Sequence, residues 1–321
     1  MRWWMFEAAI WFFLIIVGAA LIEILVTKGK KIFRKKLLLL VATFLVLAWG
    51  VVFYGSYIEP KILIVKNESF DLVGLNEPLR VVLLSDIHIG PYKGAGWVEE
   101  IVKKTNEQKP DLVLLLGDFV MGQEGKTEQL AALGKFESKY GTFAILGNHD
   151  YDAGRSEEVK KALESFGIKV LVNTSTPIKL SDDSVLWLAG AGDLWNDIDL
   201  EKTLSGRTTA ENVLLMSHNP DVVLSSENDV ADLIVSGHTH GGQIRLPWLG
   251  PVSNVPTELG KGFDEGWFEQ TTLSDFSIPD SFVDDDYVVK TIPFFITSGL
   301  GEMGPRARLF NPPEIVMLEL E

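Results

Sequence analysis

Every histidine in this chain stands within a few residues of the end of a short apolar segment, and this placement constrains the fold more than any other feature. The segments are rich in Val, Leu and Ile, and Gly, Ser, Asp or Asn follows each at once. That pattern is typical of buried strands in a mostly β-α-β sheet. The five segments are Val81–Leu84, Leu112–Leu116, Phe143–Leu146, Val213–Met216 and Leu233–Val235.

A polar block follows each predicted strand. Ligands of α/β sheets bind outside the carboxyl ends of the strands, so five converging ends would gather these blocks in one cleft. In Asp86-x-His88 and His238-x-His240, the two-residue spacing places both side chains on one side of an extended backbone. The blocks are Ser85-Asp86-Ile87-His88, Gly117-Asp118, Gly147-Asn148-His149-Asp150, Ser217-His218 and Ser236-Gly237-His238-Thr239-His240.

The donor types in these blocks indicate a metal site. Imidazole, carboxylate and amide groups without thiolate suit Zn, Mn or Fe. The chain contains no cysteine, which excludes disulfides, thiolate zinc sites, iron–sulfur clusters and a cysteine nucleophile. A single histidine is more often structural, but two Asp, one Asn and at least three His exceed what one ion can use. We therefore expect a two-metal hydrolytic centre.

The charge divides the chain into two unlike parts. Residues 1–60 hold seven Lys and Arg against three Asp and Glu, whereas the remainder holds 22 against 41. The overall formal charge of -15 argues against a nucleic-acid-binding surface, because phosphate neutralisation needs clustered Lys and Arg.

The basic part consists of two apolar runs, Trp3–Val26 and Leu37–Tyr57, around the segment Thr27–Lys36. Each run is long enough to span a bilayer, and aromatic residues at their ends fit interfacial belts. The intervening segment carries six positive charges, which predicts a cytoplasmic loop and an extracytoplasmic location for everything after residue 58. An alternative for the first run is a cleaved signal peptide.

The ordered set DxH, GD, GNHD, xH and GHTH resembles the calcineurin-like metallophosphoesterase superfamily over residues 78–321. The segments Gly237–Gly250 and Ser298–Ile315 resemble the branch whose members carry N-terminal transmembrane segments. The resemblance implies an α/β fold, a four-layer α/β-β/α sandwich with two central mixed sheets. We expect this domain at residues 61–321, preceded by a transmembrane hairpin at residues 1–60.

The resemblance also implies roles for individual residues. One divalent ion would be held by Asp86, His88 and His240. A second would be held by Asn148, His218 and His238, and Asp118 would bridge the two. His149 would stand beside the metals without coordinating and protonate the leaving oxygen, and Asp150 would orient it.

Other features bear on the substrate. Phe-Val-Met-Gly follows Asp118, without the second Asp and the Arg of the protein-phosphatase branch, which favours a phosphodiesterase or a phosphomonoesterase of broader type. Arg245, Arg306 and Arg308 are candidates for contacting a substrate phosphate or, equally, ordinary ion-pair residues. An acidic insertion at about 257–290, with nine Asp and Glu, is either a lid or, as we favour, a solvated loop.

Together these observations predict a membrane-anchored, dinuclear phosphoesterase that hydrolyses a phosphodiester or pyrophosphate bond near the bilayer. A lipid-linked or cell-envelope substrate, such as a UDP-diacylglucosamine-type lipid or a phospholipid, is the favoured class. The alternatives are a non-catalytic metal-binding envelope protein and a tethered nucleotide phosphodiesterase.

Overall fold

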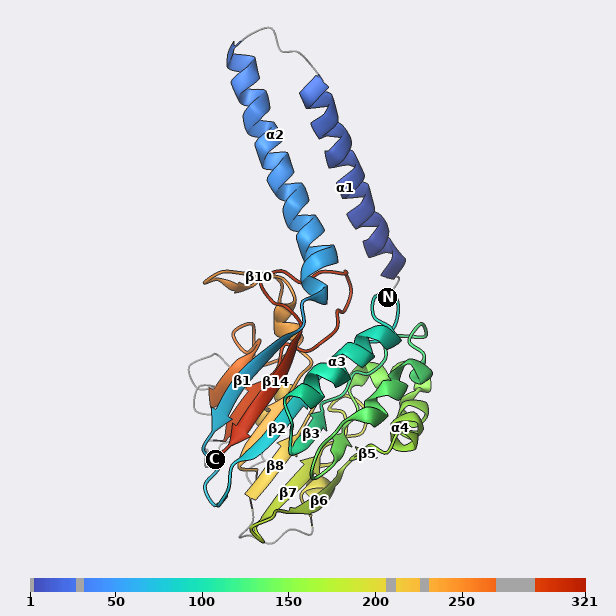
Figure 1. Ribbon diagram of the computed structural model, residues 1–321, viewed down its shortest axis with the longest axis vertical. Helices are drawn as coiled ribbons and strands as arrows, with labels where there is room; N and C mark the ends of the chain where they lie inside the picture. The colour runs from blue at the N-terminus through green and yellow to red at the C-terminus, as the bar shows by residue number, and fades with distance from the viewer. Residues whose placement is uncertain (1–2, 27–31, 206–211, 226–230, 270–291) are drawn as a thin grey trace.

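The computed structural model describes residues 3–26, 32–205, 212–225, 231–269 and 292–321. Two long helices, α1 (Trp3–Val26) and α2 (Ile32–Phe53), project from a body of sheets and helices (Figure 1). Half of the predicted basic loop (27–31) and most of the predicted acidic insertion (270–290) lie outside the described residues.

The two projecting helices lie side by side and expose most of their apolar side chains (Figure 1). The indole Nε1 of Trp49 in α2 donates to the carbonyl oxygen of Leu14 in α1 over 3.1 Å. Both helices are long and apolar enough to cross a membrane, as the sequence predicts. Helix α2 continues through a π-helical turn (Tyr54–Ile58) and a 3-10 turn (Glu59–Lys61) into the first strand of the body.

The first sheet has six strands in the order β1-β14-β2-β3-β4-β5. Strands β2 to β5 are parallel, β14 is antiparallel to β2, and β1 is parallel to β14. The strands are β1 (Ile64–Phe70), β2 (Leu79–Leu84), β3 (Leu112–Leu115), β4 (Thr142–Ala144), β5 (Lys169–Val170) and β14 (Glu314–Leu320).

The second sheet also has six strands, in the order β12-β13-β9-β8-β7-β6. Its four central strands are parallel, and both edge strands are antiparallel to their neighbours. The strands are β6 (Thr174–Lys179), β7 (Val185–Gly190), β8 (Asn212–Met216), β9 (Leu233–Ser236), β12 (Gly266–Glu269) and β13 (Pro293–Ile296). A separate two-stranded hairpin comprises β10 (Arg245–Leu246) and β11 (Gly250–Pro251).

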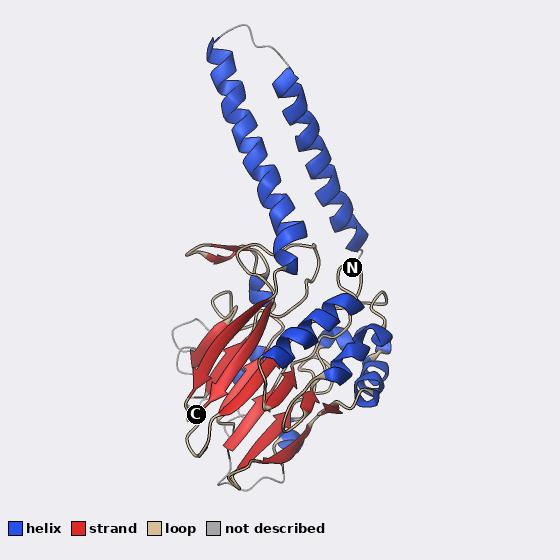
Figure 2. Ribbon diagram, in the orientation of Figure 1, coloured by secondary structure: helices blue, strands red, loops and turns tan. Residues whose placement is uncertain are grey.

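The two large sheets pack face to face, and helices cover their outer faces (Figure 2). Side chains such as Leu114 in β3 and Leu214 in β8 fill the space between the sheets. The outer face of the first sheet packs against α3 (Ala95–Glu107), η3 (Thr127–Lys135) and α4 (Ser156–Ser165). The outer face of the second packs against α5 (Leu200–Thr203) and η6 (Pro220–Leu224). This four-layer arrangement confirms the predicted fold class.

The structure corrects the grouping of the strands. The five histidine-bearing segments are divided between the sheets, with β2, β3 and β4 in the first and β8 and β9 in the second. Residues 266–269 of the expected acidic insertion form strand β12, where Trp267 stacks on Phe70 with ring centroids 5.2 Å apart.

Candidate metal centre

The carboxyl ends of strands from both sheets meet at one site. The backbone N–H of His238, after β9, donates to Asp86 Oδ2, after β2, over 3.1 Å. His218 Nδ1, after β8, lies 2.7 Å from the carbonyl oxygen of Leu116, after β3. These contacts join loops that follow strands of the first sheet to loops that follow strands of the second. The packing of the two sheets therefore holds the polar blocks together.

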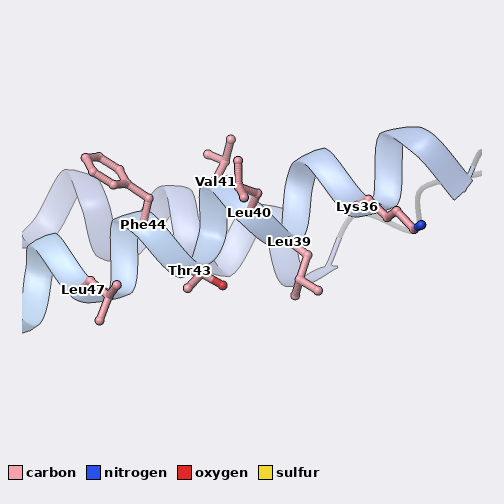
Figure 3. A pocket seen from close by; sticks show the side chains of 7 residues that line it. All are labelled: Lys36, Leu39, Leu40, Val41, Thr43, Phe44 and Leu47. Atoms are coloured by element: carbon pink, nitrogen blue, oxygen red, sulfur yellow. The ribbon is translucent and has the colours of Figure 1, made fainter.

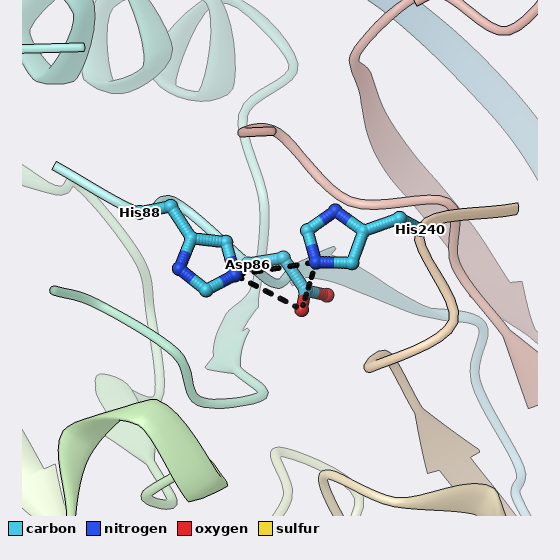
Figure 4. A group of neighbouring side chains, drawn as sticks. All are labelled: Asp86, His88 and His240. Atoms are coloured by element: carbon cyan, nitrogen blue, oxygen red, sulfur yellow. Dashed lines mark hydrogen bonds and ion pairs between the residues drawn. The ribbon is translucent and has the colours of Figure 1, made fainter. Parts of the chain in front are cut away.

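Asp86, His88 and His240 form the first group of candidate metal ligands (Figure 4). His88 Nε2 and His240 Nε2 are 3.2 Å apart. Asp86 Oδ1 lies 3.3 Å from His240 Nε2 and 3.8 Å from His88 Nε2. All three side chains are buried, so the atoms converge on one point that is shielded from water.

Asp118, His218 and His238 form the second group. His218 Nε2 lies 3.2 Å from Asp118 Oδ2 and 3.3 Å from His238 Nδ1. The same Asp118 oxygen is 3.4 Å from His88 Nε2 of the first group. Asp118 therefore lies between the two groups, where a carboxylate could bridge two ions.

Buried polar atoms without partners test whether these residues suit cations. Asp86 Oδ1 and Asn148 Oδ1 are both buried and accept no hydrogen bond from any described residue. A buried oxygen left in this state costs free energy comparable to a lost hydrogen bond. Ligation of a divalent cation would satisfy both atoms, and the residues therefore fit metal ions.

The protonation states also suit metal binding. Burial lowers the pKa of His88 to about 3 and the pKa values of His238 and His240 to about 4 each, so these imidazoles are neutral at pH 7. Burial opposes charge on Asp118, but His218 and His88 outweigh it and hold the Asp118 pKa well below its usual value. Neutral imidazole and charged carboxylate are the forms that ligate metals.

His218 differs from the other buried histidines. Burial disfavours its charge, but the contacts with Asp118 and Asp86 raise its pKa to about 10. In the metal-free protein, a protonated His218 thus offsets part of the negative charge of the two carboxylates. Binding of a divalent ion at this position would displace that proton.

The backbone at five of the candidate ligands lies in the left-handed region, which residues other than glycine rarely adopt. Each such residue costs on the order of 1–3 kcal/mol, and the strain persists only where the surroundings fix the conformation. The five φ angles are 55° for Asp86, 46° for His88, 57° for Asp118, 71° for His238 and 53° for His240.

Glycines pack directly against the candidate ligands. A Cβ at Gly237 would collide with Ser85 Oγ and Asp86 Oδ2, and one at Gly147 would collide with Asp118 Oδ1. No side chain fits at these positions, so the space available requires glycine before His238 and before Asn148.

The second group opens into a cavity of about 320 Å³. Asp118, Asn148, His149, His238 and His240 line it, together with Trp195, Gln243, Ser253, Asn254 and Met303. A larger hollow of about 710 Å³ is lined only by residues of α2, most of them apolar (Figure 3). Since no candidate ligand lines that hollow, we place the functional site in the smaller cavity.

Comparison with known proteins agrees with this geometry. Residues 79–242, which contain every candidate ligand, match the calcineurin-like phosphoesterase family. The chain belongs to this family. The domain is thus a metal-dependent phosphoesterase domain by descent, as the sequence predicts.

Relatives of this phosphoesterase include an uncharacterized metallophosphoesterase of Campylobacter jejuni, 31% identical over 80% of this chain and 63% of the relative. A transmembrane protein with metallophosphoesterase domain from Danio rerio is 33% identical over 66% of this chain and 51% of its own length. The phosphodiesterase YaeI of Escherichia coli is 32% identical over 54% of this chain and 64% of its own. The chain therefore spans less than two thirds of the length of these relatives.

The one histidine in neither group of candidate ligands, His149, lies at the wall of the cavity. Its ring lies 5.3 Å from that of His88, and its Nδ1 is 2.8 Å from Asp152 Oδ2. Burial lowers the His149 pKa, but Asp118 and Asp152 outweigh burial and raise it above its usual value.

The sequence predicts that Asp150 orients His149, but the structure shows the Asp150 carboxylate bound to backbone groups and a different carboxylate at the imidazole. Asp150 is buried, and its two carboxylate oxygens accept hydrogen bonds from the backbone N–H groups of Gly147, Asp118 and Phe119. The carboxylate thus fixes the two ligand-bearing loops, and Asp152 is the residue that contacts the imidazole.

The three arginines considered for substrate binding also have other partners. Arg245 pairs with Asp264, and Arg306 Nε lies 3.1 Å from Glu7 Oε1 in α1. Arg308 is fully buried and donates to the carbonyl oxygens of nearby loop residues. None of the three is among the described residues that line the cavity.

Sequence reasoning missed two residues at the site. Asp152 lies two positions beyond the GNHD block, so a search for a carboxylate near His149 could have found it. Trp195 packs edge-on against the His238 ring at 4.9 Å, yet it lies in a loop with no recognisable pattern. Only the folded arrangement of the second sheet reveals its position.

We expect Gly237→Ala to weaken binding of divalent ions by about 10–100-fold, the usual effect of disturbing groups that orient metal ligands. The added methyl group would displace the Asp86 carboxylate, since the two cannot occupy the same space. Titration of the purified full-length protein with Mn²⁺ measures this effect. Gly96→Ala in α3 is the matched control, because nothing lies within 4 Å of its added Cβ. Equal affinities of the two variants would contradict the prediction.

Proposed function

We propose that this protein is a membrane-anchored, two-metal phosphoesterase that hydrolyses a phosphodiester or pyrophosphate bond of a lipid-linked or cell-envelope substrate. Phospholipids and UDP-diacylglucosamine-type lipids are the favoured examples. In this proposal a transmembrane hairpin (1–60) holds the phosphoesterase domain (61–321) at the bilayer.

The position of Asp118 between two His and Asp groups is the observation that carries the hydrolytic part of the proposal. Asp86, His88 and His240 would hold one ion, Asn148, His218 and His238 the other, and Asp118 would contact both. Two divalent ions held there would supply Lewis acidity toward phosphoryl oxygens and would lower the pKa of bound water. Mn, Zn and Fe all suit these donors.

His149 would act as the general acid. It lines the cavity, and its contacts with Asp118 and Asp152 favour the protonated ring. Because Asp152 holds Nδ1, the other ring nitrogen is the one that could donate a proton to the leaving oxygen. A protein that only bound metal would have no use for this arrangement, which argues against the non-catalytic alternative.

The register of the first sheet supports a site close to the bilayer. Strand β1 begins three residues after the last turn of the α2 extension, and its Ile64 pairs with Glu314 at the start of β14. Leu83, near the end of β2, pairs with Val316. The end of β2, and with it Asp86, therefore lies at the end of the sheet from which α2 emerges.

A direct chain of contacts supports the same conclusion. Glu59, at the base of the hairpin, accepts a hydrogen bond from the backbone N–H of Asn311 over 2.6 Å. The Asn311 side chain in turn donates to the carbonyl oxygen of His240 over 2.7 Å. Only Asn311 thus separates the base of the hairpin from a candidate ligand, which supports phosphoesters at the membrane surface as substrates.

We expect Asp118→Asn to lose bound metal and phosphodiesterase activity together, because both groups depend on this carboxylate. His149→Ala should keep both ions but lose about 10²–10⁴-fold in turnover, the usual contribution of a general acid. Metal content and hydrolysis of bis(p-nitrophenyl) phosphate by the full-length protein measure both effects.

Asp152→Asn is the companion variant, and it should lower turnover without loss of metal. Loss of metal in His149→Ala would show that His149 is a ligand. A metal-replete native protein without activity on any ester class would favour the metal-binding alternative.

The proposed substrate class predicts a preference for lipid-linked phosphoesters over soluble ones. Phosphoesters presented in lipid vesicles should be hydrolysed with a higher kcat/KM than water-soluble nucleotide diesters or pyrophosphates of the same bond type, because the anchor confines the site to the bilayer. A panel assay of the reconstituted protein measures the ratio. Preference for the nucleotides would support the tethered nucleotide phosphodiesterase instead.

The positive charges of residues 27–36 predict a cytoplasmic loop. A cysteine placed by Lys31→Cys should then resist an impermeant thiol reagent in intact cells, and it would be the chain's sole thiol. Protease added to spheroplasts should digest residues 61–321. A domain protected until the membrane is broken would overturn this orientation.

A further inference from the structure

The tip of the β10–β11 hairpin exposes large apolar side chains. Trp248 is 102% exposed and Leu249 is 77% exposed, while Leu246 and Val252 on either side are also exposed. Side chains of this size on a protruding turn mark an interaction surface. We call residues 246–252 the apolar tip.

The composition around the apolar tip restricts what it can contact. Residues 246–256 contain no charged side chain, although residues 61–321 carry 41 Asp and Glu against 22 Lys and Arg. The tip therefore has no charge with which to attract a charged partner. Its contact must be with an apolar environment, and a tryptophan at the end suits one that borders water.

The apolar tip lies beside the base of the membrane hairpin. Figure 1 shows β10 projecting next to the lower end of α2. The connection is short, since the Arg245 N–H donates to the carbonyl oxygen of Leu309 over 2.9 Å and the Arg308 N–H donates to that of Gly55 over 2.8 Å. Gly55 belongs to the extension of α2, so the tip and the helix are fixed to the same loop.

We propose that the apolar tip inserts into the interfacial layer of the bilayer that holds α1 and α2. This inference rests on the membrane anchoring in the proposed function. The bilayer is the occupant that the position favours, because the tip stands at the level where α2 leaves the body. Trp at the water–lipid boundary, with Leu and Val beside it, is the composition that such a layer accepts.

Insertion would also orient the catalytic cavity. Gln243, just before the hairpin, and Ser253 and Asn254, just after it, line that cavity. The wall of the cavity is thus continuous with the segment in the lipid. A phosphoester at the depth of the head groups would reach the candidate metal centre without leaving the membrane surface.

Three single-cysteine variants of the full-length protein test the proposal, since the native chain has no cysteine. Trp248→Cys reports on the apolar tip, and Leu47→Cys reports on α2. Val73→Cys is the matched control, because Val73 is 82% exposed. The neighbouring Leu72 N–H donates to the carbonyl oxygen of Glu321 at the chain end, which lies opposite the helices (Figure 1).

Each variant is labelled with an environment-sensitive fluorophore and placed, one chain per disc, in phosphatidylcholine–phosphatidylglycerol nanodiscs. A fraction of the lipids carries a nitroxide near the top of the acyl chain. We expect strong quenching and a blue-shifted emission at Trp248→Cys and quenching at Leu47→Cys, with neither change at Val73→Cys.

The outcomes distinguish insertion of the apolar tip from membrane anchoring by α1 and α2. Quenching at Leu47→Cys with a Trp248→Cys signal like that of Val73→Cys would overturn the insertion of the tip and leave the anchor standing. A blue shift at Trp248→Cys without quenching would mean that protein covers the tip, which also overturns the proposal. Absence of quenching at Leu47→Cys would overturn the anchoring and this inference with it. None of these readouts depends on catalysis.

Discussion

The Asp118 carboxylate is the interaction on which the arrangement of the site depends. One oxygen lies 3.4 Å from His88 Nε2 and 3.2 Å from His218 Nε2, and the other accepts the backbone N–H of His149 over 2.8 Å. His88 follows a strand of the first sheet and His218 a strand of the second. The carboxylate is thus the point at which both sheets and the His149 loop meet, and its charge helps to raise the pKa values of His218 and His149.

The sequence was sufficient to predict the strands that precede the candidate ligands, and the polar side chains at the ends of those strands. Buried parallel strands read as unbroken runs of Val, Leu and Ile, so β2, β3, β8 and β9 were found within about two residues of their bounds. Edge strands such as β6 and β12 were not predicted, because the sequences of half-exposed strands of mixed composition resemble those of loops. Assignment of strands to sheets failed as well, since strand order depends on long-range pairing that the local pattern does not encode.

The candidate site divides in the same way. The candidate ligands were named from the residue types at strand ends together with the family resemblance, whereas the partners of these residues depend on packing. Asp150 and Asp152 follow His149 by one and three residues, and only the fold shows that backbone N–H groups bind the first while the second contacts the ring. Arg308 illustrates the point further, because full burial beneath the α2 extension makes it a structural residue.

The left-handed backbone at five candidate ligands has a consequence for how this protein would change without selection for activity. Strain of on the order of 1–3 kcal/mol per residue persists only where the surrounding structure fixes the conformation, and it lowers the stability of the protein for as long as these side chains are kept. Glycine at His88 or His238 would remove both a ligand and its strain, and so exchange function for stability. Descendants released from selection should therefore drift toward Gly or Asn at these five positions. Aspartate and histidine retained in so unfavourable a conformation would record continued use of the site.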